Sequence, residues 1–381
     1  MSLEDTLRAG VCRQLIEGKL TEGAAAERLS LSVRQVRRCK RRVREEGDGG
    51  VVHRSRGRAS PRRVGEDQEA EVRRLYEGTY AGWNMVHLGE WLESKHGLRL
   101  SHETLRRILV DEESRPHRRH RKHHAWRERR GRAGELVQWD TSIHPWFGAD
   151  GEKAVLILAV DDATSRIVWA EFFEHDGVLE NLSVLRSVVR KHGLPESLYA
   201  DGTSKFFLTK EEVLAARERG EDGLTQFGRV TKTLGIGRIH ALSPEAKGRV
   251  ERSFRTLQDR LQKELAVLGL RTRADGNRYL RKTFIPDYNR RFGVAAADPS
   301  GAWLKVAPLD EPNVFCLRET RTVLNDLTIP VEGERWQLHG GVRSRERVEL
   351  RTRLDGSVHV YKRDQELEYH RIQRARKAAS G

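Results

Sequence analysis

AVLILAV, at positions 154–160, is an uninterrupted apolar run that follows the shorter stretch LVQWD at 136–140. A short run with no polar alternation is typical of a strand buried on both faces. IVWAEFF at 167–173 comes after the turn-forming pair Asp161 and Asp162, and it predicts a hairpin partner for that strand. Three consecutive strands therefore predict the centre of a sheet.

The chain downstream of these strands alternates between helix and strand. An amphipathic helix is expected at 178–192 and is broken by GLP at 193–195; a short strand at 197–200 then ends at Asp201. Ser243 and Pro244 predict the start of a long helix, with the serine as cap and the proline at the first helical position. Further helices are expected at 211–219 and 226–234, and a strand at 237–241. This order predicts a mixed sheet flanked by helices.

The first 52 residues have the pattern of a helix-turn-helix. A short alanine-rich helix around 24–29 and a tight turn precede a second helix from about 33 to 45, which Ser32 and Gln35 can start with a capping box. The second helix of such a unit enters the DNA major groove. The alternative is a charged, solvated helix in a bundle. We expect DNA contact from the arginines on its outer faces, namely Arg34, Arg37, Arg38 and Arg41.

A basic linker, 53–65, separates this unit from a second helical unit at 66–114. Gly97 is expected to end one helix and Ser101 to cap the next, which carries Arg106 and Arg107 on its outer side as candidate DNA contacts. Trp83 and Trp91 are interpreted as core residues and not as base-stacking groups.

Residues 115–132, RPHRRHRKHHAWRERRGR, form a basic tether with a single acid. Blocks of like charge are usually solvated or bound to nucleic acid. We expect phosphate contacts here from Arg118, Arg119, Arg121 and Lys122. At the other end of the chain, alternating segments and the turn Asp355-Gly356 predict hairpins, and we expect a small β-barrel over 315–375.

The overall charge favours a polyanionic partner. The chain has 71 Lys and Arg against 56 Asp and Glu, a net charge of +15. Nucleic acid is the first candidate and an anionic membrane surface the second. No apolar run approaches the ~20 residues of a membrane span and no signal peptide is visible, so we expect no membrane partner. Three scattered cysteines argue against disulfides and zinc and favour a reducing cytoplasm.

Three carboxylates stand where the predicted sheet can gather them. Asp140 ends the apolar run of the first strand, Asp201 follows a later strand, and Glu251 lies on the long helix. Phosphodiester chemistry needs a Lewis acid at both the attacking and the leaving oxygen, and two cations about 4 Å apart supply both. Mg²⁺ prefers oxygen ligands.

Cationic side chains near these carboxylates are candidates for contacts with DNA phosphates: Lys205, Lys247 and Arg255. For Arg255, an ion pair with Asp259 or Glu251 is the equal alternative. His144 is a weaker candidate for proton transfer, Trp146 and Phe147 are interpreted as packing residues, and Asp161 and Asp162 as turn residues in preference to metal ligands.

Several stretches carry a family resemblance, among them ILAVDDATSRIVWAEF (157–172), LPESLYADGTSKFF (194–207) and ALSPEAKGRVERSFRTLQDRL (241–261). They closely resemble transposases of the ISNCY insertion-sequence group and, more distantly, retroviral integrase cores. The resemblance implies a ribonuclease-H-like core over 133–295, with Asp140, Asp201 and Glu251 as metal ligands. The spacing from Asp201 to Glu251 exceeds that of the integrases, which an insertion around 209–222 explains.

The sequence thus predicts a multidomain α+β protein that acts as a DDE transposase. It is expected to bind double-stranded DNA at its element's terminal inverted repeats, nick the 3′ ends and join them to target DNA. The expected cofactor is Mg²⁺, two ions with Mn²⁺ as a substitute, and the expected assembly is a dimer or larger. The alternatives are a catalytically silent DNA-binding regulator derived from a transposase, and a ribonuclease-H-like nuclease acting on RNA–DNA hybrids.

Overall fold

The structure is a computed structural model that describes residues 1–57, 63–110, 128–240 and 248–372. Its contacts divide the chain into two compact units, Met1–Arg74 and Leu75–Gly381. Each unit is described below by itself. No helix among the described residues is long and apolar enough to cross a membrane.

The N-terminal unit is a small helical bundle. It contains α1 (Leu3–Ile16), α2 (Glu22–Leu29), α3 (Val33–Glu46) and the 3₁₀ turn η1 (Gly47–Val51). The predicted capping box at the start of α3 is confirmed, since the Ser32 hydroxyl accepts from the Gln35 N–H and the Gln35 side chain accepts from the Ser32 N–H. Val36 and Val43 are buried, whereas Val33 lies outside the core with 38% of its surface exposed.

The second helical segment has the predicted start and stop signals. α4 (Glu66–Gly78) crosses the boundary between the units and is followed by α5 (Met85–His96) and α6 (His102–Leu109). Gly97 ends α5 in the left-handed region, with φ 68°, and the Ser101 hydroxyl accepts from the Thr104 N–H at the start of α6. Trp83 and Trp91 are buried, which confirms their interpretation as core residues.

The core of the second unit is a five-stranded mixed sheet with the order β3-β2-β1-β4-β5. β1 pairs antiparallel with β2, and β2 with β3, while β1–β4 and β4–β5 are parallel. These pairings confirm the mixed sheet of the expected ribonuclease-H-like core. The strands are β1 (Val137–Ile143), β2 (Val155–Asp161), β3 (Ile167–Phe173), β4 (Ser197–Ala200) and β5 (Gly237–His240). Asp140 lies in the middle of β1 and not at its end, because the strand continues through the polar residues after it.

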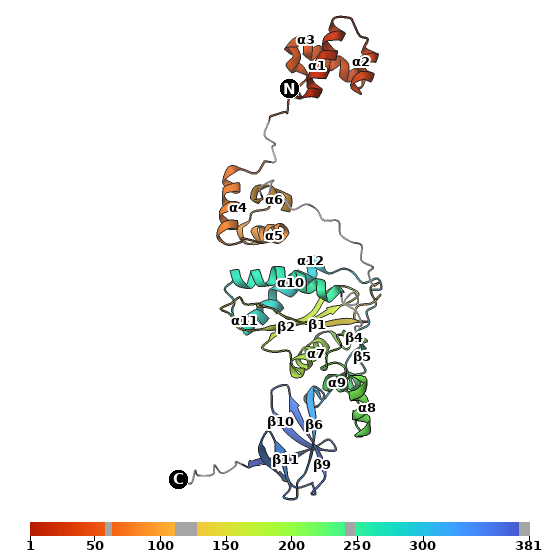
Figure 1. Cartoon of the computed structure of the whole chain (residues 1–381), viewed down its shortest axis with the longest axis vertical. Helices are drawn as coiled ribbons and strands as arrows, with labels where there is room; N and C mark the ends of the chain where they lie inside the picture. Colours follow the sequence, from red (N-terminus) through yellow and green to blue (C-terminus); the bar gives the residue numbers. More distant parts are fainter. Residues whose placement is uncertain (58–62, 111–127, 241–247, 373–381) are drawn as a thin grey trace. The chain divides into compact units, whose positions relative to one another are not determined.

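Helices cover both faces of this sheet (Figure 1). α7 (Val178–His192) and α9 (Gln226–Thr233) pack on the face that carries Trp139 and Ile157. α10 (Gly248–Val267) packs with α12 (Ile285–Phe292) on the face that carries Leu156 and Leu158. The remaining helical segments are α8 (Lys210–Glu218), α11 (Arg273–Tyr279) and the π-helical turn η4 (Leu280–Phe284). The predicted start of the long helix at 243–244 lies outside the described residues.

A short helix, α13 (Glu311–Val314), leads into a six-stranded antiparallel sheet with the order β6-β9-β10-β11-β8-β7. The sheet curls around one apolar core that contains Ile329, Trp336 and Val360, in agreement with the expected small barrel. The turn at Asp355-Gly356 joins β9 to β10 as predicted, and Gly356 adopts φ 81° there. Its strands are β6 (Cys316–Thr322), β7 (Thr328–Val331), β8 (Glu334–His339), β9 (Arg347–Arg353), β10 (Val358–Lys362) and β11 (Gln365–Ile372).

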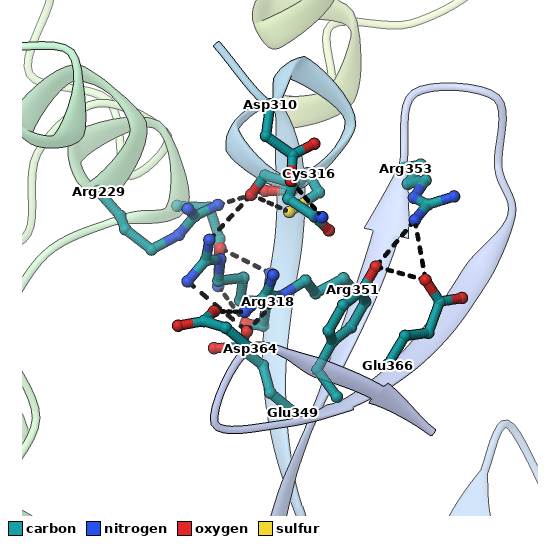
Figure 2. Close-up of polar contacts among 12 residues, drawn as sticks. Arg229, Asp310, Cys316, Arg318, Glu349, Arg351, Arg353, Asp364 and Glu366 are labelled. Carbon is teal, nitrogen blue, oxygen red and sulfur yellow. Dashed lines mark hydrogen bonds and ion pairs between the residues drawn. The ribbon is translucent and has the colours of Figure 1, made fainter. Parts of the chain in front are cut away.

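The first strand of this barrel is fixed to α9 of the core by polar contacts. The Gln226 amide donates to the Arg318 carbonyl (2.6 Å) and accepts from the Arg318 N–H (3.0 Å). Figure 2 shows the guanidinium of Arg229 directed at the Cys316 carbonyl, to which it donates a hydrogen bond. Burial, and then the neighbouring Arg318, lower the pKa of Arg229. The barrel is thereby anchored to a helix that covers the core sheet.

Candidate functional site

Asp140 lies on β1, and Asp201 directly follows the neighbouring strand β4. β1 and β4 pair in parallel, with Gln138 opposite Tyr199. Continuing this register by two residues puts Asp140 level with Asp201, which directly follows the last residue of β4. Because adjacent strands are about 4.8 Å apart, the backbones that carry these two carboxylates run side by side.

Asp140 lies on the face of the sheet that α10 covers. It pairs across the antiparallel ladder with Leu158, and paired residues share a face. Leu158 packs in the same apolar cluster as the buried side of α10. A hydrogen bond of 3.2 Å from the Gln258 amide on α10 to the Ser142 hydroxyl on β1 places the helix along this strand.

Both aspartates are half-buried and accept local hydrogen bonds. Asp140 accepts from the Thr141 N–H at 3.0 Å, and Asp201 accepts from the Thr203 hydroxyl at 2.9 Å.

Glu251 lies in the first turn of α10 and is exposed. The residue before it, Val250, donates its N–H to the side-chain oxygen of Gln138 at 3.0 Å, and Gln138 stands two positions before Asp140 on β1. This bond joins the start of α10 to the strand that carries the first carboxylate. Glu251 is thus held next to β1.

Within the described residues, no three His, Cys, Asp or Glu side chains stand together at metal-binding distance. The donor set nevertheless fits a hard divalent cation, because Asp140, Asp201 and Glu251 offer only carboxylate oxygens and the first two are level on paired strands. The assignment of the three as ligands stays a prediction.

Asp161 and Asp162 differ in what they bind, although both are buried. Asp161 holds the turn after β2, because its oxygens accept from the N–H groups of Gly134 and Thr164, at 2.8 Å each. Asp162 instead binds distant side chains: the Gln138 amide on β1 and the Arg249 guanidinium on α10, each at 2.7 Å. The predicted turn role therefore fits Asp161. For Asp162 that prediction did not include the contacts with β1 and α10.

The arginines predicted to contact DNA from α3 are placed on its solvent side. Arg34, Arg38 and Arg41 are exposed. Arg37 is exposed as well, and its guanidinium lies 2.7 Å from the Glu22 carboxylate on α2. α3 therefore presents a row of cations while Val36 and Val43 face inward. Contact of these arginines with DNA stays a prediction.

The other candidate DNA contacts have varied surroundings. On α6, Arg107 is exposed and Arg106 half-buried. The ammonium of Lys205 is paired with the Asp176 carboxylate, so a phosphate would compete with that partner. Arg255 is exposed and forms no ion pair with any residue in the described part of the chain, so the alternative of an ion pair with Asp259 or Glu251 is not formed. Five candidates lie outside the described residues: Arg118, Arg119, Arg121, Lys122 and Lys247.

Trp146 and Phe147 are buried and both contact the Phe172 ring, which confirms their packing role. His144 lies 3.1 Å from the Gln262 side-chain oxygen on α10. A role of His144 in proton transfer stays a prediction.

A polar contact surface between α5 and α10 was not anticipated from the sequence. His87 on α5 lies 2.8 Å from a Glu264 oxygen, and Glu90 pairs with Arg260 and with Arg291. These partners are remote in the chain, and none belongs to a motif. The one available signal is that charged residues recur on the inward side of α10, where Arg260 and Glu264 are buried.

The sequence is similar to one family model and to two transposases. A family model described as a homeodomain-like domain matches residues 35–109. The transposase y4bF of Sinorhizobium fredii (strain NBRC 101917 / NGR234) is 36% identical over 341 residues, which make up 89% of this chain and 73% of that protein. The transposase for insertion sequence IS1202 of Streptococcus pneumoniae is 29% identical over 327 residues, 76% of this chain and 69% of that protein.

Two solved structures are similar at low identity. A chain of the simian T-cell lymphotropic virus intasome, in complex with PP2A regulatory subunit B56 gamma, aligns with 77% of this chain and 97% of its own length, at 14% identity and a TM-score of 0.34. The HTLV-2 integrase catalytic core domain, in complex with magnesium and in its dimeric form, aligns with 45% of this chain and 96% of its own length, at 16% identity and a TM-score of 0.31.

Proposed function

Because this chain belongs to the transposase family, as its relationship to y4bF over most of both chains shows, we propose that it is a DDE transposase that cuts and rejoins DNA at the ends of its own element. In this proposal the N-terminal helical units bind the terminal inverted repeats, and the core performs cleavage and strand transfer. Two ends must be held together for such a reaction, so the active species is a dimer or larger assembly on the DNA of the bacterial nucleoid.

The observation that carries the catalytic proposal is the register between β1 and β4. Continued by two residues, this register puts Asp140 on β1 level with Asp201, which directly follows β4, although sixty residues of chain lie between them. The Gln138–Val250 hydrogen bond then holds the first turn of α10, with Glu251, beside the same strand. These two observations support the proposal that Asp140, Asp201 and Glu251 act together in metal-assisted phosphoryl transfer.

Asp140, Asp201 and Glu251 would hold the Mg²⁺ ions. When bound, the two ions supply Lewis acids at the attacking and leaving oxygens of the scissile phosphate. The chain's own residues would bind and orient the DNA. Arg255 is exposed one helical turn beyond Glu251, and in this proposal it binds a DNA phosphate near the site.

Cleavage of a labelled duplex that carries the element's own end, identified by sequencing the DNA around the gene, tests this proposal. Asp140→Asn, Asp201→Asn and Glu251→Gln keep the shape of each side chain and remove one negative ligand. Each variant should bind the end duplex nearly as the wild type does and lose cleavage and strand transfer by several orders of magnitude. The wild type should need Mg²⁺ or Mn²⁺ and fail with Ca²⁺, whose coordination is longer and looser.

The alternative function, a silent DNA-binding regulator, predicts a different result in the same assay. It requires end-specific binding without any metal-dependent nicking by the wild type. Retention of near wild-type cleavage by one carboxylate variant would remove that residue from the ligand set, and retention by all three would overturn the transposase mechanism.

A further inference from the structure

Asp162 stands at the centre of a buried network that joins the strand of one proposed ligand to the helix of another. One of its carboxylate oxygens accepts from the Gln138 amide and from the Arg249 guanidinium, at 2.7 Å each. The other accepts from the Arg130 N–H at 2.9 Å. Asp162 is fully buried, and the side chain of Arg249 is 7% exposed.

The positions of its two side-chain partners give the network its meaning. Gln138 precedes Asp140 by two residues on β1, and Arg249 precedes Glu251 by two residues on α10. Gln138 also accepts from the Val250 N–H at 3.0 Å, so strand, turn and helix are joined in a closed set of contacts. Buried hydrogen bonds between charged and polar side chains are strong in the protein interior, and they restrain the arrangement of the elements that they join.

We propose that Asp162 is a positioning residue that sets the start of α10 against β1 and so fixes the distance between the Glu251 and Asp140 carboxylates. This inference rests on the proposed function. Asp162 itself faces Gln138 and Arg249 and holds no metal. Its role is to fix where the metal ligands stand, because a shift of α10 along β1 would move Glu251 but leave Asp140 in place.

The neighbouring residue provides a matched control. Asp161 is a buried aspartate in the same turn, and its partners in the structure, Gly134 and Thr164, belong to loops and not to α10. Asp161→Asn and Asp162→Asn therefore make the same chemical change one residue apart. Only the second change reaches the helix that carries Glu251.

The test measures Mn²⁺ binding to the full chain by electron paramagnetic resonance, without DNA and without turnover. Asp162→Asn should weaken Mn²⁺ binding roughly 10- to 100-fold, the usual effect of losing an orienting contact behind metal ligands, and Asp161→Asn should leave it near wild type. Arg249→Lys, which keeps the cation, should bind Mn²⁺ more tightly than Arg249→Gln. Equal Mn²⁺ affinities for the two aspartate variants would overturn the inference.

Two further variants keep the outcome interpretable. Circular dichroism shows whether Asp162→Asn folds. If it does not, Gln138→Leu removes the hydrogen bond to Val250 and leaves the buried Asp162–Arg249 pair in place. This variant should weaken Mn²⁺ binding in the same way, and an affinity equal to that of the wild type would count against the inference. Asp140→Asn separates this failure from that of the proposed function. Unchanged Mn²⁺ binding in Asp140→Asn would refute the proposed metal site itself. Weaker Mn²⁺ binding in Asp140→Asn, together with wild-type binding in Asp162→Asn or Gln138→Leu, would refute only the positioning role.

Discussion

Nε2 of His87 on α5 lies 2.8 Å from Oε1 of Glu264 on α10, and both side chains are buried. The other oxygen of Glu264 accepts from the Tyr279 hydroxyl at 2.6 Å, and the His87 ring stacks on Trp83 with the centroids 4.1 Å apart. Burial and the Glu264 carboxylate raise the pKa of Tyr279. The Glu264 carboxylate thus contacts polar side chains of α5 and of α11 together.

Replacing Glu264 with alanine should therefore destabilise this unit. The change leaves the His87 ring and the Tyr279 hydroxyl buried without their acceptor, at about 1–3 kcal/mol for each group. Glu264→Gln retains a side-chain oxygen acceptor and should lose less. Urea unfolding of the full chain measures both variants, and an unfolding free energy for Glu264→Ala within about 0.5 kcal/mol of wild type would contradict this role of the carboxylate.

The arginines of α3 should contribute sequence-specific binding. Arg34→Ala, Arg38→Ala and Arg41→Ala should each cost about 1–3 kcal/mol in binding to the end duplex if the side chain contacts a base, and less if it contacts a phosphate. Arg13, an exposed arginine on α1, is the matched control and should have little effect. Equal affinity of the wild type for end and random duplexes at ~0.15 M salt would refute specific recognition by this helix.

The secondary structure of the core could be predicted where apolar residues leave one interpretation. The strand at 167–173 and the helix at 178–192 match the structure at both ends. β1 was predicted too short, because Thr141 and Ser142 interrupt its apolar run although they continue the ladder with β2. The positions of Asp140 and Asp201 could be inferred because each follows a short apolar run on a strand of the sheet.

The contacts that join these elements could not be predicted in the same way. His87 and Glu264 are 177 residues apart, and Asp162 and Arg249 are 87 residues apart. Such pairs depend on which faces of the sheet and the helices pack together, and the local sequence pattern does not predict this packing. Gln138, which stands between the apolar residues Val137 and Trp139, was a local sign in the sequence that β1 carries a polar contact to another element.

The basic tether should act through its charge. Changing Arg118, Arg119, Arg121 and Lys122 to glutamine should lower affinity for end and random duplexes alike. It should also flatten the slope of log affinity against log salt concentration by roughly 3 to 4, because each phosphate contact contributes about 0.9. Fluorescence anisotropy at salt concentrations from about 50 to about 200 mM measures both the affinity and its salt dependence. A selective loss for the end duplex with an unchanged slope would show base recognition by the tether instead.

His192 should make the stability of the core depend on pH. Burial lowers the pKa of this imidazole below its ordinary value of 6.5, while its Nε2 lies 3.1 Å from the Val168 carbonyl and its ring packs near Trp303. The unfolded chain therefore binds this proton more readily than the folded chain does. Above pH 6.5 both forms are neutral and His192 adds no pH dependence. As the pH falls below that value, the free energy of unfolding decreases, by at most about 1.4 kcal/mol per pH unit for a single proton.

The variant His192→Gln tests this dependence, because its side chain stays neutral and can still donate to the Val168 carbonyl. As the pH falls from neutral to below 6.5, the free energy of unfolding of the variant should decrease less than that of the wild type. His102, which is exposed, gives the control substitution His102→Gln, and its pH profile should follow the wild type. Urea unfolding at a series of pH values measures the difference, and parallel profiles for wild type and His192→Gln would show that this buried imidazole does not set the acid limit of the fold.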